Sequence, residues 1–135
     1  REETTAGEAE LVSGESPAAA TADTFTDEQA MAVGSEQGGL VLVGCAHRGI
    51  VNSVVAAQAA AGGRPILAAL GGAHLRSADA ARIDWSARRM RQLVAHVALG
   101  HCTGKAAESR FAAAFGPAFH PLRMGWRWQI PRATV

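Results

Sequence analysis

Three apolar segments of this chain each run into a glycine that is closely followed by a histidine. The segments cover residues 40–43, 66–70 and 94–99, and the histidines are His47, His74 and His101. Helical patterns separate the segments, and strands that alternate with helices form parallel sheets. Ligands of such sheets bind in the crevice beyond the carboxyl ends of the strands. If the three strands are parallel neighbours, we therefore expect their imidazoles to converge at one edge of one sheet.

The remaining pattern predicts an α/β fold with a mixed sheet. Residues 29–33 read as a further strand, which a glycine-rich turn joins to the strand at 40–43 as an antiparallel hairpin. Helices are expected over residues 50–61, after a cap at Ser77, and over residues 105–115 with Thr103 as cap. A last strand or hairpin is expected over residues 118–130, where Trp126 and Trp128 would close one end of the core.

The charge is spread unevenly, although the 135 residues have a formal net charge of only +1. Eight of the 12 acidic residues lie within the first 28 positions, against a single arginine. We therefore interpret residues 1–24 as a flexible acidic leader and residues 25–135 as one folded domain. The basic residues elsewhere suit a solvated helix face better than a nucleic-acid site, and no apolar run is long enough for a membrane span.

Histidine and cysteine side chains are the residues here that suit a metal site. A neutral imidazole and a thiolate are both good ligands for zinc and related ions, so His47, His74 and His101 are candidate ligands of one site. Cys45 is either a fourth ligand or a hydrogen-bonded neighbour, whereas Cys102 is expected to point elsewhere from an extended segment. His96 and His120 lie outside the pattern and are interpreted as structural.

Other chemistry has weaker support. A nucleophile pair of Cys45 with His74 or His101 is a minority interpretation. The sequence contains no Gly-x-Ser-x-Gly for a serine triad and no phosphate-binding loop. Both cysteines stand beside histidine motifs, which favours a reducing, cytoplasmic compartment over a disulfide. Two unrelated buried thiols are the other interpretation.

Four stretches carry a family resemblance. They are DEQA at 27–30, GLVLVGCAHRGIVN at 39–52, GGAHL at 71–75 and HCTG at 101–104. Together they resemble the metallo-β-lactamase-fold hydrolases over about residues 25–130. Among these hydrolases, they look most like the branch of the dihydropterin-ribofuranosyl-aminobenzene-phosphate synthases. The resemblance implies an αββα sandwich whose metal, usually zinc and sometimes iron or manganese, activates water to attack a small-molecule substrate. It places His47, His74 and His101 at active-site strand ends, and Cys45 where many relatives have a metal-bridging aspartate.

The resemblance also implies that the site is incomplete in this chain. Such hydrolases carry a His-x-His-x-Asp-His motif in the first half of the fold, and these 135 residues contain none. We therefore expect half of the sandwich, with helices on one face of its sheet and with weak metal binding by this chain alone. A homo-oligomer or a complementary chain with the missing motif would complete it. The alternative function is a non-catalytic binding or assembly module that keeps half of the fold.

Overall fold

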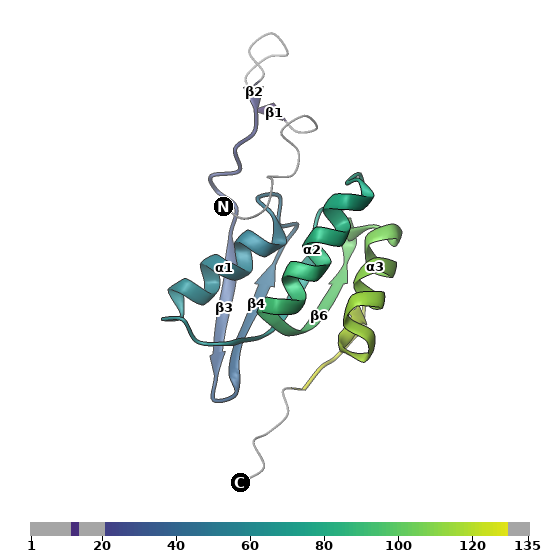
Figure 1. Cartoon of the computed structure of the whole chain (residues 1–135). Helices are drawn as coiled ribbons and strands as arrows, with labels where there is room; N and C mark the ends of the chain where they lie inside the picture. The colour runs from purple at the N-terminus through teal and green to yellow at the C-terminus, as the bar shows by residue number, and fades with distance from the viewer. Residues whose placement is uncertain (1–11, 14–20, 130–135) are drawn as a thin grey trace.

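A five-stranded sheet and three helices make up the domain, in a computed structural model that describes residues 12–13 and 21–129 (Figure 1). The strands lie in the order β3 (Ala30–Ser35), β4 (Gly38–Val43), β5 (Ile66–Gly72), β6 (Val94–Gly100) and β7 (Phe119–Pro121). The helices are α1 (Ile50–Ala60), α2 (Ala80–Leu93) and α3 (Lys105–Phe115), with short 3-10 turns η2 (His101–Thr103) and η3 (Gly116–Ala118). The predicted α/β class and mixed sheet are confirmed.

Handedness explains why the helices share one face. Strands β4 to β7 are parallel neighbours in chain order, and a helix connects each to the next. Crossovers between parallel strands are right-handed. Because each new strand is added on the same side of the previous one, all the connecting helices lie on one face of the sheet. Figure 1 shows α1, α2 and α3 side by side over that face. Only β3 runs antiparallel, as the partner of β4 in the predicted hairpin.

The core lies between this helical layer and the sheet. Its fully buried members come from alternate positions of the strands and from one stripe of each helix; they include Val41, Val97, Leu99, Ile50, Val54, Met90 and Phe111. Alanines such as Ala69, Ala87 and Ala107 are also buried there. Their small side chains allow the helices to lie close to the sheet, which explains how an alanine-rich sequence packs well.

The opposite face of the sheet carries exposed apolar side chains. Met31 pairs with Leu42 across the β3–β4 hairpin and Val33 pairs with Leu40, so the four side chains point to the side away from buried Val41. Met31, Val33 and Leu42 are 63%, 41% and 39% exposed. One layer of helices on a sheet whose other face exposes apolar side chains at the hairpin is the half-sandwich that the sequence predicts.

Two helices begin with other caps than the sequence predicts. Asp79, not Ser77, caps α2, because its carboxylate accepts the backbone N–H of Arg82 at 2.8 Å. Gly104, not Thr103, precedes α3 and makes no side-chain capping bond. The Thr103 hydroxyl is used instead to join two loops, as described below.

The C-terminal segment is less regular than expected. Strand β7 covers three residues, and residues 122–129 form no strand. Trp126 and Trp128 do not close an end of the core. Their rings lie 5.7 Å from His120 and 5.3 Å from His96 between centroids, on the sheet face opposite the helices.

Most of the predicted acidic leader, residues 1–11 and 14–20, lies outside the described residues. The described part of residues 1–24 contains two short strands, β1 (Val12–Ser13) and β2 (Thr21–Ala22), which pair antiparallel. None of the helices in the described ranges is long and apolar enough to cross a membrane.

Candidate metal centre

The loops that follow β4, β5 and β6 lie together at one edge of the sheet. Pairing of Gly72 with Gly100 aligns the ends of β5 and β6. The Gly72 N–H donates to the Gly44 carbonyl at 2.8 Å, which holds the loop after β4 beside the end of β5. His47, His74 and His101 follow these three parallel strands, so they lie at the same edge, as the strand pattern predicts. That they bind a metal together stays a prediction.

The backbone at this edge is unusual. Ala46, His74 and His101 have φ values of 54°, 44° and 54°, in the left-handed region that side chains with a Cβ rarely adopt. Each such residue costs about 1–3 kcal/mol and persists only where its surroundings impose the conformation, and such positions gather at functional sites. Three of the four non-glycine residues with positive φ in the described ranges lie in these loops.

His47 is held by a carboxylate that comes from the segment before β3. Nδ1 of His47 lies 3.1 Å from Glu28 Oε1, and Glu28 also accepts the backbone N–H groups of His47 and Arg48. The Phe25 ring stacks on the imidazole at 4.6 Å between centroids, and His74 meets its edge at 4.5 Å. An acceptor at Nδ1 fixes the tautomer and leaves Nε2 as the coordinating atom, which is how second-shell carboxylates support metal ligands.

Cys45, His101 and Cys102 form a second group of donors. Their ligand atoms all lie within 4.8 Å of one another. The expectation that Cys102 points elsewhere is wrong, because residues 101–103 form the η2 turn rather than an extended segment. The Cys102 thiol instead donates to the Cys45 carbonyl at 3.6 Å. Burial raises the pKa of the Cys102 thiol to about 11, against the lowering effect of the His74 backbone N–H.

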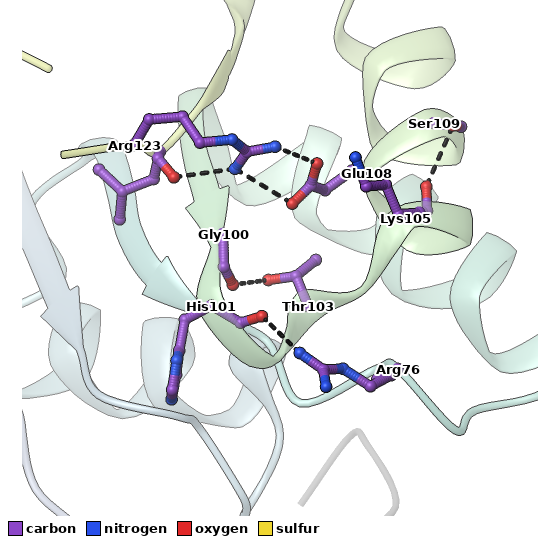
Figure 2. A network of polar contacts seen from close by, with 9 residues as sticks. Arg76, Gly100, His101, Thr103, Lys105, Glu108, Ser109 and Arg123 are labelled. Carbon is purple, nitrogen blue, oxygen red and sulfur yellow. Dashed lines mark hydrogen bonds and ion pairs between the residues drawn. The ribbon is translucent and has the colours of Figure 1, made fainter.

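A buried threonine joins the loops that carry His74 and His101. The Thr103 hydroxyl donates to the Gly100 carbonyl at 2.7 Å and accepts the Ala73 N–H at 3.1 Å. Thr103 is fully buried, so both bonds are shielded from water. The two loops are therefore fixed relative to each other through one side chain, whose bond to Gly100 is drawn in Figure 2.

A cationic cavity of about 390 Å³ opens beside His101, lined by Arg76, His101, Gly104, Lys105, Glu108 and Arg123. Arg76 Nη2 donates to the His101 carbonyl at 3.2 Å, and Arg123 pairs with Glu108 at 2.6 Å (Figure 2). A Cβ at Gly104 would lie 2.7 Å from Arg76 Cα, so glycine there allows the two loops to touch. Three cations against one carboxylate, at the N-terminus of α3, favour an anionic group.

The fold has a solved relative. It superimposes on the crystal structure of Tm1679, a metal-dependent hydrolase of the β-lactamase superfamily, with a TM-score of 0.77 and 26% identity. The match covers 93% of this chain and 52% of Tm1679. The chain has a metallo-β-lactamase-like fold. No family model matches the sequence.

The sequence comparison agrees with this metallo-β-lactamase-like fold. The chain is 36% identical over 104 residues to 7,8-dihydropterin-6-methyl-4-(β-D-ribofuranosyl)-aminobenzene-5'-phosphate synthase of Methanocaldococcus jannaschii. The match covers 76% of this chain and 35% of that protein. The chain therefore spans about half of Tm1679 and about a third of the synthase, and the predicted resemblance is confirmed for that part.

The donors at the sheet edge fit a metal. Nitrogen and sulfur ligands suit zinc and related transition metals, and they exclude ions such as magnesium and calcium that require oxygen. A Cβ on Gly72 would lie 2.6 Å from Cys102 Sγ, so the missing side chain leaves the space into which that donor projects. Glu28 and Cys102 lie within the stretches DEQA and HCTG, but the sequence pattern assigns neither of them to the site.

Proposed function

We propose that this chain supplies part of the metal site of a metal-dependent hydrolase, with His47, His74, His101 and Cys45 as ligands and zinc, iron or manganese as the metal. The observation that carries the proposal is the placement of three histidines at one edge of a metallo-β-lactamase-like sheet. Tm1679, which shares this fold, is itself described as a metal-dependent hydrolase.

Each part of the edge has a role in this proposal. A bound metal of this class supplies Lewis acidity and an activated water. Glu28 orients His47, and the Thr103 hydroxyl keeps the loops of His74 and His101 in register. The cationic cavity beside His101 binds the anionic part of a small-molecule substrate. The name of the Methanocaldococcus relative includes a 5'-phosphate, which is a group of this kind.

Completion of the site requires more protein than this chain. The chain covers about half of Tm1679 and lacks the His-x-His-x-Asp-His motif, so a complementary polypeptide with that motif is proposed to pack on the bare sheet face. A homo-oligomer is the other arrangement, and the cytoplasm is the proposed compartment.

Hydrolysis tests this function directly. The chain, combined with a polypeptide that carries the missing motif, is assayed on the chromogenic diester bis(p-nitrophenyl) phosphate with zinc. We expect turnover that a chelator abolishes and that His74→Asn reduces by at least about tenfold, the loss typical when support of a metal site fails. Asparagine tolerates the left-handed backbone at this position. His120→Asn, in β7 and outside the proposed set of ligands, is the matched control. Turnover that is unaffected by both His47→Asn and His74→Asn would overturn the proposal.

The bare sheet face favours a second candidate, a non-catalytic binding or assembly module. Met31, Val33 and Leu42 are exposed together there, and exposed apolar patches mark interaction sites. This candidate gains support if the completed assembly is stable and hydrolyses none of the ester, amide and phosphodiester substrates in the presence of zinc, iron or manganese.

A further inference from the structure

Two thiols and one imidazole meet at the sheet edge without help from any other chain. Cys45 follows β4, whereas His101 and Cys102 follow β6, and their donor atoms lie within 4.8 Å of one another. In tetrahedral coordination with a zinc–sulfur bond of about 2.3 Å, two ligand sulfurs are about 3.8 Å apart. Small side-chain rotations are therefore enough to bring these donors onto one ion.

The meeting of the two cysteines depends on the strand between them. Strand β5 separates β4 from β6, and its last residue, Gly72, lies between the two cysteine-bearing loops. A Cβ on Gly72 would lie 2.6 Å from Cys102 Sγ and 2.9 Å from the Gly44 carbonyl oxygen. Any larger residue at this position would push Cys102 away from Cys45. The absence of a side chain thus creates the space in which the thiols approach.

The turn that carries two of the donors is fixed on both sides. Thr103 anchors η2 to Gly100 and to Ala73, and Arg76 Nη2 donates to the His101 carbonyl at 3.2 Å. Figure 2 shows the Arg76 guanidinium bound to this carbonyl and the His101 ring projecting to the other side. The Arg76 guanidinium therefore holds the backbone of the turn, and the imidazole of His101 is exposed.

We propose that Cys45, His101 and Cys102 bind one zinc-like ion as a thiolate–imidazole site that is complete within this chain. Binding forms two metal–sulfur bonds and one metal–nitrogen bond, and each thiol releases its proton to solvent. Thiolate ligands select zinc or cadmium over magnesium, calcium and manganese. Three protein ligands leave one coordination position open. The proposal shares Cys45 and His101 with the hydrolase site above and goes beyond it, because it adds Cys102 and requires neither His47 nor His74 and no partner.

Cadmium is the probe, because cadmium–thiolate bonds absorb in the ultraviolet. The full chain, reduced with a phosphine and kept anaerobic, is titrated with cadmium, and native mass spectrometry counts the ions. We expect a charge-transfer band that saturates at one ion per chain. Cys45→Ser and Cys102→Ser should each lower the band by about half and weaken binding at least tenfold. His74→Asn, a member of the histidine set alone, is the matched control and should leave the band unchanged.

Alkylation gives a measurement that does not depend on any variant folding. In the unaltered chain, one equivalent of cadmium should protect both Cys45 and Cys102 from iodoacetamide, with each site mapped by mass spectrometry. Manganese should protect neither. A folded chain without the band, or with both cysteines equally reactive with and without cadmium, would overturn the proposal. The two proposed sites share Cys45 and His101 but differ in His74 and Cys102. Loss of hydrolysis in His74→Asn together with an intact band would therefore support the thiolate site, whereas loss of the band in the unaltered chain would count against the thiolate site alone.

Discussion

At two positions of the sheet edge, the close packing determines the residue type. Gly72 must lack a Cβ, and Thr103 must have a hydroxyl group. Gly72 has no room for a Cβ, since Cys102 Sγ and the Gly44 carbonyl would both lie under 3.0 Å from it. Thr103 needs its hydroxyl, since this group satisfies a buried N–H of the neighbouring loop. The Gly71-Gly72 pair carries little information as a sequence motif. Glycine is required at position 72 because the loops after the neighbouring strands β4 and β6 lie against it.

Gly72→Ala should destabilise the chain, because the added methyl group overpacks the edge. Overpacking a close-fitted position costs about 1–3 kcal/mol, so the urea midpoint should fall measurably. Gly34→Ala in β3 is the matched control, because a Cβ there meets nothing within 4 Å. Equal unfolding midpoints for the two variants would contradict the close approach at Gly72.

Thr103→Val should cost about 1–3 kcal/mol, because it leaves the Ala73 N–H buried without its acceptor. Thr103→Ser keeps the hydroxyl and tests the bond separately from the methyl group. We expect the serine variant to retain most of the stability that valine loses in urea unfolding. If valine is as stable as the wild type, the hydroxyl does not join the two loops.

At the scale of elements, β6 and β7 present two histidines to the C-terminal segment. The rings of His96 and His120 lie 5.8 Å apart between centroids, with Trp128 5.3 Å from His96. Burial lowers the pKa of His96 below its usual 6.5, and the positive charges of His120 and Arg91 act in the same direction. The lowered pKa favours the neutral form of His96, which packs against His120 and Trp128.

Acid should loosen this cluster. A histidine whose folded pKa is lowered contributes its full stability above the unfolded value of 6.5, and that contribution is lost as the pH falls below it. We expect the urea midpoint to fall between pH 7.5 and about pH 5, before most carboxylates titrate. Tryptophan fluorescence follows the unfolding. His96→Gln should flatten this pH dependence, and an unchanged slope in that variant would contradict the assignment.

The elements themselves were largely predictable. Helices at 50–61 and 105–115 and strands at 40–43, 66–70 and 94–99 agree with the structure to within a few residues, because their apolar periodicity reflects burial directly. The site was predictable only in part. The contact of Glu28 with His47 joins residues 19 positions apart across a hairpin, and no local pattern signals it. The direction of the Cys102 side chain depends on the 3-10 turn at His101–Thr103. The sequence pattern predicts an extended segment there.

At the scale of the whole molecule, one face of the sheet is the surface that favours a partner. The helical layer covers one side of the sheet, whereas the hairpin exposes Met31, Val33 and Leu42 on the other. Strand β3 also forms an edge of the sheet, where unpaired backbone groups add to the attraction for another chain. Both features favour association through the same region of the molecule.

We expect the purified chain to associate through this face, as a dimer or with a complementary chain, because Met31, Val33 and Leu42 are exposed together beside an edge strand. Light scattering over a concentration series should give a mass above that of the monomer.

Leu42→Glu places a charge within the patch and should shift the chain toward monomer at the same concentration. Met124→Glu is the matched control, because Met124 is 104% exposed and lies after β7, away from the hairpin. A monodisperse monomer with one cooperative thermal transition would contradict the prediction, because it would show that the chain is stable without a partner on this face. Dissociation by Met124→Glu and not by Leu42→Glu would place the interface elsewhere.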